Sequence, residues 1–180
     1  MKHKITLLLL TMFTSVLFSQ TVSISGTSYN SITEAITAAS SGDVIDISGV
    51  HTETINISKS ITLRGTDPST DIIQAAASAL TDGTGSKVIN IVRAEDTDVL
   101  TVSVESLGIR HGNASTTQNG GGINVDKVTG LLILNNLIIE NNFTAKNGGG
   151  LLLLGVIPFH SQLSKRGAIH ARRRHRAWWS

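Results

Sequence analysis

The feature that most constrains this chain is a short unit that occurs twice. Residues 119–122 read Asn-Gly-Gly-Gly, and residues 147–150 read the same, 28 positions later. Upstream, residues 104–109 (VESLGI) align with residues 134–139 (LNNLII) at a spacing of 30. A unit this short cannot bury its own apolar face, so it needs neighbours above and below it. The sequence therefore predicts a solenoid of stacked coils.

Short β-rich stretches indicate which kind of solenoid to expect. Residues 55–57 (INI) and 61–63 (ITL) alternate apolar and polar side chains, which is the period of a strand with one buried face. Frequent turn residues such as Gly42-Asp43 separate the stretches. This pattern favours an all-β fold, a parallel β-helix. The expected strands are 44–47, 54–57, 61–63, 88–92, 100–104, 123–125, 131–134 and 137–139, and a further one begins within 148–154.

One α-helix is expected, over about residues 31–40. Ser31 and Glu34 have the spacing of a capping box, and Gly42 follows as a stop signal. The apolar residues recur at i, i+3, i+4 and i+7, as in an amphipathic helix: Ile32, Ala35, Ile36 and Ala39. A helix in this place would cover the apolar end and the unpaired backbone groups of the first coil. We therefore interpret it as an N-terminal cap.

These residues carry a family resemblance. The run 31–65 resembles the opening of secreted right-handed parallel β-helix proteins of the pectin-lyase-like superfamily, with a helix, a Gly-Asp turn and a strand pair that ends in Leu-Arg-Gly. Residues 107–125 resemble the repeat of bacterial surface β-helix proteins, and residues 143–151 are similar to the repeat of polymorphic outer membrane proteins. The resemblance implies a right-handed β-helix over residues 21–154. It leaves function open, because the superfamily contains lyases, hydrolases, adhesins and passenger domains.

The resemblance also suggests which residues to consider for chemistry. Similar lyases use clustered Asp or Glu residues for Ca²⁺ with an Arg or Lys base, and similar hydrolases use clustered Asp residues. The catalytic candidates are Asp96, Asp98, Arg110 and His111, and the Ca²⁺ candidates are Glu95, Asp96 and Asp98. The simpler interpretation is a solvated acidic turn for the carboxylates and a polar strand end for the other two. We expect no catalytic site, and no cofactor or metal unless the chain is a lyase that binds Ca²⁺.

The glycines and asparagines of the recurring unit have a structural interpretation. Positive φ angles or close backbone approach would exclude side chains at the glycines, and the asparagines would stack one coil apart and form hydrogen bonds. The residues concerned are Asn119, Gly120, Gly121, Gly122, Asn147, Gly148, Gly149 and Gly150. Three asparagines, Asn56, Asn113 and Asn142, begin N-x-S/T triplets, which permits glycosylation without predicting it.

The two ends of the chain differ from its middle. Lys2 and Lys4 precede an uncharged stretch of 14 residues, 5–18, which has the form of a signal peptide with cleavage after Ser19 and is shorter than the about 20 residues of a spanning helix. We expect residues 1–20 to direct export, and an uncleaved N-terminal anchor is the alternative. The absence of cysteine excludes disulfides and thiolate metal sites.

The C-terminal segment, residues 155–180, is basic and rich in tryptophan and histidine. It holds six of the 15 Lys and Arg residues, whereas all 13 acidic residues precede it. Three interpretations are open: an end translated out of frame, which would make the chain an N-terminal fragment; a disordered tail without a specific role; or an arm that binds nucleic acid or an anionic membrane. The residues between 21 and 154 carry a net charge of −6, which disfavours nucleic acid as their partner.

The expected function follows from these observations. We expect a secreted or cell-surface module, on the outer membrane in a bacterium, that is structural or adhesive and has no catalytic site of its own. The alternative is a truncated polysaccharide lyase or glycoside hydrolase. The expected partner is a polysaccharide or a host or cell-surface ligand. Membrane association would require an uncleaved signal or a missing C-terminal region.

Overall fold

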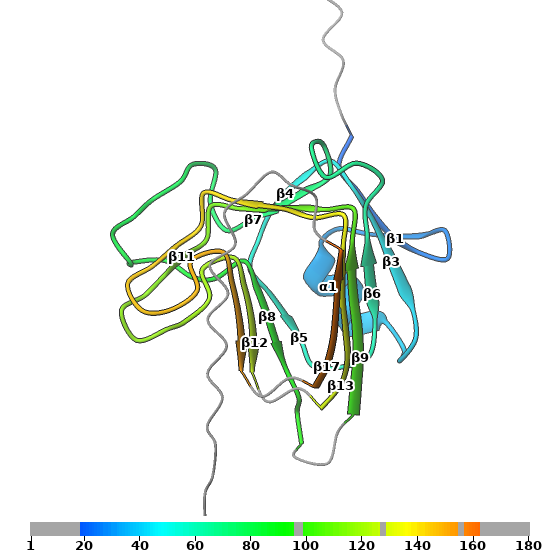
Figure 1. Cartoon of the computed structure of the whole chain (residues 1–180). Helices are drawn as coiled ribbons and strands as arrows, with labels where there is room; N and C mark the ends of the chain where they lie inside the picture. The colour runs from blue at the N-terminus through cyan, green and yellow to red at the C-terminus, as the bar shows by residue number, and fades with distance from the viewer. Residues whose placement is uncertain (1–18, 96–98, 127–128, 155–156, 163–180) are drawn as a thin grey trace, which may run out of the picture.

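The computed structural model describes residues 19–95, 99–126, 129–154 and 157–162 of the chain. This part is mostly β, with one helix (Figure 1). Its strands form three large sheets and one two-stranded sheet, and most of the pairings are parallel. The expected all-β class is therefore confirmed.

The sheets differ in their number of strands. The first sheet has the order β17-β13-β9-β6-β3-β1-β2: β1 Thr21–Ile24, β2 Thr27–Tyr29, β3 Val44–Ser48, β6 Thr62–Arg64, β9 Val99–Glu105, β13 Thr129–Asn135 and β17 Ile157–Gln162. The second has the order β14-β10-β7-β4: β4 Val50–Thr52, β7 Ile72–Gln74, β10 Gly108–Arg110 and β14 Ile138–Glu140. The third has the order β16-β12-β8-β5: β5 Ile55–Ile57, β8 Ile89–Val92, β12 Ile123–Asp126 and β16 Leu151–Leu154. The two-stranded sheet pairs β11 Asn113–Ala114 with β15 Phe143–Thr144.

From β3 onward the chain visits the first, second and third sheets in turn, four times over. Each visit adds a strand next to the previous one in parallel register. In the first sheet Val104 of β9 pairs with Leu134 of β13, and in the second sheet Ile109 pairs with Ile139. These are the residues that the sequence aligned at a spacing of 30. Equivalent positions of successive segments therefore lie side by side along each sheet.

The core lies between the sheets and consists of stacked aliphatic side chains. Ile45, Leu63, Val104 and Leu134 of the first sheet are fully buried, and each pairs with the next. Inward positions of the third sheet continue the core: Ile55, Ile57, Ile89, Ile91, Ile123, Val125 and Leu151. Burial of one such side chain contributes about 1.5–3 kcal/mol. The core therefore holds the sheets together mainly through aliphatic packing and without disulfides.

Every strand expected from the sequence overlaps an observed strand, but several observed strands were not expected. Some of them, such as β4, β7 and β10, read VHT, IIQ and GIR, in which apolar and polar residues do not alternate as they do in residues 55–57. The antiparallel hairpin of β1 and β2 had a detectable signal: Val22 and Ile24 alternate with polar residues before a Ser25-Gly26 turn. Both turn residues have positive φ, 48° and 85°, as a tight hairpin turn requires.

The expected helix is confirmed as α1, Ile32–Ala38. Ser31 is its N-cap, and its hydroxyl accepts a hydrogen bond of 3.0 Å from the Glu34 backbone N–H. The Glu34 carboxylate accepts from the Asn30 N–H, one residue earlier than a capping box requires. Ile32 and Ala35 are fully buried, and α1 contacts β1, β3 and β5 at the N-terminal end of the sheets (Figure 1).

Two charged side chains outside the helix hold it at both ends. The Glu53 carboxylate accepts hydrogen bonds from the backbone N–H groups of Ile32 at 2.9 Å and Thr33 at 3.0 Å, and from the Thr33 hydroxyl. The Lys59 ammonium donates to the Ala39 carbonyl at 2.8 Å. An anion at the N-terminus and a cation at the C-terminus both complement the helix dipole. This pairing attaches α1 to the chain segment around β5.

Replacement of Glu53 with alanine is expected to lower the free energy of unfolding by about 1–2 kcal/mol, the usual effect of losing an N-terminal cap. The reason is that two backbone donors in the first turn of α1 lose their partner. Urea denaturation measures the change as a lower midpoint. Glu34→Ala is the matched control, because Glu34 is an exposed carboxylate whose partners belong to Asn30. An equal or larger loss in the control would contradict the role of Glu53.

Parts of the chain lie outside the described residues. These include residues 1–18, which hold most of the expected signal segment, and residues 163–180 of the expected tail. Beyond residue 154, where the pattern was expected to stop, β17 pairs in parallel with β13. No helix among the described residues is long and apolar enough to cross a membrane.

Candidate functional site

The candidate catalytic residues from the sequence are only partly described. Asp96 and Asp98 lie outside the described residues, and Glu95 is exposed in a bend beyond β8, next to that gap. Arg110 ends β10 in the second sheet, and His111 follows it. Within the described ranges no group of three His, Cys, Asp or Glu side chains is arranged to hold a metal ion. The structure therefore places Arg110 and His111 together and does not test the acidic cluster.

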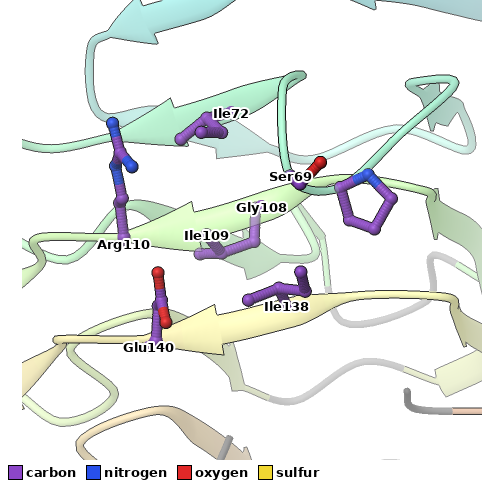
Figure 2. Close-up of a pocket in the computed structure, with 8 residues that line it drawn as sticks. Ser69, Ile72, Gly108, Ile109, Arg110, Ile138 and Glu140 are labelled. Carbon is purple, nitrogen blue, oxygen red and sulfur yellow. The ribbon is translucent and has the colours of Figure 1, made fainter. Parts of the chain in front are cut away.

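Arg110 belongs to a row of polar side chains across the outer face of the second sheet. Thr52, Gln74, Arg110 and Glu140 occupy equivalent positions on the four strands. The Arg110 Nε donates to Gln74 Oε1 at 2.9 Å, and Gln74 Nε2 donates to Thr52 Oγ1 at 2.9 Å. In Figure 2 the Arg110 side chain extends toward β7, while Glu140 projects from the next strand. Arg110 therefore joins a hydrogen-bonded chain that connects three strands.

A shallow hollow of about 200 Å³ lies beside this row (Figure 2). Gly108 forms its floor between Ile72 and Ile138, and the loop residues Pro68 and Ser69 form one rim. A Cβ at Gly108 would meet the Pro68 carbonyl oxygen at 2.6 Å, so the loop packs directly on the strand. The hollow is smaller than the about 300–1,000 Å³ of ordinary ligand pockets. It has space for one small group next to the Arg110 guanidinium.

His111 occupies a structural corner of the chain. Its φ is +60°, in the left-handed region, and the equivalent residue one segment later, Asn141, has a φ of +52°. The backbone N–H of His111 donates to the Asn141 carbonyl, and its ring Nδ1 lies 3.0 Å from the Ala76 carbonyl oxygen. A catalytic base would need a ring nitrogen directed at a substrate and a positioned partner. The observed contacts serve to connect neighbouring turns.

The recurring Asn-Gly-Gly-Gly segments stack directly on each other. The backbone N–H groups of Gly120, Gly121 and Gly122 donate to the carbonyls of the residues 27 positions later, which are Asn147, Gly148 and Gly149. Asn147 Nδ2 donates to Asn119 Oδ1 at 3.4 Å. A Cβ at Gly121 would overlap the carbonyl oxygens of Phe143 and Gly149, and Gly120 and Gly148 have positive φ angles. Close backbone approach therefore accounts for the glycines.

Asp71, which the sequence analysis did not select, is a buried carboxylate that accepts four hydrogen bonds. It is 3% exposed and accepts hydrogen bonds from the backbone N–H groups of Gly49, Thr66 and Asp67 and from the Thr66 hydroxyl. Burial acts to raise the pKa of Asp71, but these donors outweigh burial and hold the pKa below its usual value. Asp71 connects the turn after β3 to the loop before β7, so its role is structural.

The three glycosylation triplets have different environments. Asn113 is buried, donates to Asp82 and accepts from the Gly83 N–H. Asn142 accepts from the Gly112 N–H and donates to the Ile109 carbonyl. A glycan on either amide would break these bonds. Asn56 has an exposed side chain on the outer face of the third sheet.

No family model, curated protein or solved structure matches this chain. The geometry of its own residues is therefore the basis for a functional assignment.

Proposed function

We propose that the chain is a right-handed parallel β-helix of the pectin-lyase-like superfamily, exported by its N-terminal segment, that serves as a structural or adhesive module at a cell surface. The proposal includes the absence of a catalytic site in the chain itself. Its ligand would be a polysaccharide or another surface molecule, bound without chemical change.

The observation that carries the proposal is the in-register stacking of successive chain segments over three sheets. Val104 and Leu134 pair in the first sheet, and Ile123 and Leu151 pair in the third. The spacings of 30 and 28 differ because the loop after β11 has two residues more than the loop after β15. A solenoid absorbs such differences in its loops while its strands keep their register. The strand order and the short turns are those expected of a β-helix.

The polar side chains around the Arg110 hollow support a role without catalysis. Arg110 binds Gln74, and the His111 ring lies against the Ala76 carbonyl. The two carboxylates that flank the loop over the hollow have structural partners: Asp71 accepts four hydrogen bonds, and Asp67 accepts from Ser69. Acid–base catalysis of sugar cleavage requires two carboxylates that face one substrate, or a carboxylate-bound cation with a free base. The described residues present an exposed Glu140 alone beside Arg110.

Incubation of the full chain with pectin and with alginate, with and without Ca²⁺, tests the proposal. We expect no unsaturated product, which would be detected by its ultraviolet absorbance. Product formation in either substrate would overturn the assignment of a module without catalysis.

The alternative function is that of a carbohydrate-active enzyme, and one observation favours it. Arg110 borders a hollow on the outer face of a parallel sheet, which is an accessible place for an extended polymer. If the assay gave product, the variant Arg110→Met would show whether the Arg110 hollow is the catalytic site. Loss of activity would assign catalysis to this hollow, and retained activity would assign it to residues such as Asp96 and Asp98, outside the described part of the chain.

A further inference from the structure

A ladder of asparagine side chains crosses the outer face of the third sheet. Asn56, Asn90 and Asn124 occupy the same register position on β5, β8 and β12. Asn90 Nδ2 donates to Asn56 Oδ1 at 3.0 Å, and Asn124 Nδ2 donates to Asn90 Oδ1 at 2.9 Å. Asn124 is only 6% exposed, whereas the Asn56 side chain is open to solvent. The ladder is therefore accessible at its β5 end.

A hollow of about 210 Å³ lies against this accessible end of the ladder. We call it the amide hollow. Its lining is almost entirely polar and comes from three successive segments of the chain: Thr54, Ile55, Asn56, Ser86, Lys87, Asn90 and Gln118. The amide hollow belongs to the third sheet and shares no lining residue with the Arg110 hollow.

Gln118 has an unsatisfied acceptor at this place. Its Oε1 atom is buried, and no donor among the described residues reaches it. The backbone of Gln118 is held, because its N–H donates to the Ser115 carbonyl and its carbonyl accepts from the Thr144 hydroxyl. Buried acceptors without a partner are uncommon and costly, so a rotation of the Gln118 side chain that brings Oε1 to a donor in the amide hollow would be favourable.

The remaining groups of the amide hollow both donate and accept. An amide has two N–H donors and two acceptor lone pairs on its oxygen, and the ladder uses only one of the donors of Asn90. Lys87 contributes an ammonium group that is partly buried. Burial lowers its pKa, and the charge of Asp126 acts in the opposite direction. Among the described residues, no carboxylate lies within ion-pair distance of this ammonium.

The hydrogen-bonding groups of the amide hollow favour some classes of ligand over others. Carboxylate, sulfate and fully ionised phosphate oxygens only accept hydrogen bonds, so they would satisfy Lys87 and leave Gln118 Oε1 without a donor. A hydroxyl group donates and accepts at once, and adjacent hydroxyls on one ring would meet the ammonium, the amides and the Gln118 oxygen together. We propose that the amide hollow binds the hydroxyl groups of a neutral saccharide unit. The inference rests on the adhesive part of the proposed function and gives it a ligand class.

The test is binding of neutral trisaccharides to the full chain by calorimetry. Maltotriose, cellotriose and mannotriose serve as probes, with inorganic phosphate as the anionic comparison. We expect at least one trisaccharide to bind and phosphate not to compete. Gln118→Leu and Lys87→Met are each expected to weaken binding at least tenfold. Arg64→Met is the control, because Arg64 forms an exposed ion pair with Asp46 on the first sheet, and it should leave binding unchanged.

The melting temperature of the Gln118→Leu variant distinguishes a loss of binding from a loss of folding. Gln118→Leu removes an acceptor that has no partner, so its melting temperature should equal or exceed that of the parent protein. The inference is overturned if folded parent protein binds none of the trisaccharides, if both variants bind as the parent does, or if phosphate binds in their place. Release of unsaturated product from pectin would instead overturn the proposed function and leave the binding result to stand by itself.

Discussion

Replacement of Gly121 with alanine is expected to lower the free energy of unfolding by about 3 kcal/mol or more, the upper end of the cost of overpacking. A Cβ at Gly121 would overlap the carbonyl oxygens of Phe143 and Gly149. Both obstacles are backbone atoms of the next segment, so no rotation of a side chain relieves the overlap. The Gly121 N–H also donates to the Gly148 carbonyl, and separation of the two segments would lengthen this bond. Chemical denaturation monitored by circular dichroism measures the loss.

The chain contains a matched control for this substitution. Gly149 is the equivalent glycine of the second Asn-Gly-Gly-Gly segment, and its nearest obstacle is the Asn142 carbonyl oxygen at 3.0 Å from the ideal Cβ position. Its φ, like that of Gly121, lies outside the left-handed region. Gly149→Ala should therefore cost clearly less than Gly121→Ala. Equal losses at the two positions would mean that alanine disfavours these turns for a reason other than close approach of the next segment.

Much of the fold could be predicted from the sequence because the residues of the stacked core form patterns that recur along the chain. The alternation in residues 55–57 and 61–63 placed β5 and β6, and the aligned blocks gave the pairing of Val104 with Leu134. The amphipathic stripe of α1 and its Ser31 cap were also visible. Each of these patterns is local, or compares two nearby stretches with each other, so one sequence is enough to show it.

The second sheet was harder to predict for a physical reason. Three of its four strands, β4, β7 and β10, were not expected, because their sequences VHT, IIQ and GIR do not alternate apolar and polar residues as INI of β5 does. Gly108 stands at an outward position where a loop packs on the strand, which cannot be recognised without the tertiary structure. The pairing of Arg110 with Gln74, which are 36 positions apart, depends on the same stacking. Of the residues that line the Arg110 hollow, the sequence analysis therefore identified only Arg110 itself.

Among the hydrogen bonds that position loops, the stacking of Asn147 on Asn119 was predicted, but those of the carboxylates were not. Glu53 reaches a helix 20 residues earlier, and Asp82 binds an asparagine 31 residues later. Such bonds join loops that become neighbours only when the segments stack. The acidic residues chosen from the sequence, Asp96 and Asp98, were selected because they are close in sequence. In the described structure the carboxylates that hold loops bind both distant partners, as Glu53 and Asp82 do, and near neighbours, as Asp67 does with Ser69.

Replacement of Asp71 with asparagine is expected to lower the free energy of unfolding at pH 7 by about 3 kcal/mol. A buried donor without a partner costs about 1–3 kcal/mol, and the Asp71 carboxylate accepts from three backbone N–H groups and one hydroxyl. An asparagine has one acceptor oxygen, and its NH₂ group would face a donor. The loop before β7 and the turn at Gly49 would lose their connection.

The effect of Asp71 should depend on pH in a defined direction. Its pKa is lowered in the folded protein from an ordinary value of about 3.9, so the folded state favours the carboxylate. The stabilisation is complete above the unfolded-state pKa and is lost as the pH falls through the folded-state pKa. The difference in stability between the parent and Asp71→Asn should therefore be constant near neutral pH and shrink below about pH 4.

Thermal unfolding of both proteins between pH 7 and pH 2 measures this dependence. Asp67→Asn is the control, because Asp67 also has a lowered pKa but is exposed and binds mainly the neighbouring Ser69. It should show the same direction of change with a smaller amplitude, since water replaces its hydrogen bonds. A stability difference for Asp71→Asn that persists unchanged at pH 2 would show that the shape of the side chain, and not its charge, holds the Gly49 turn against the loop before β7.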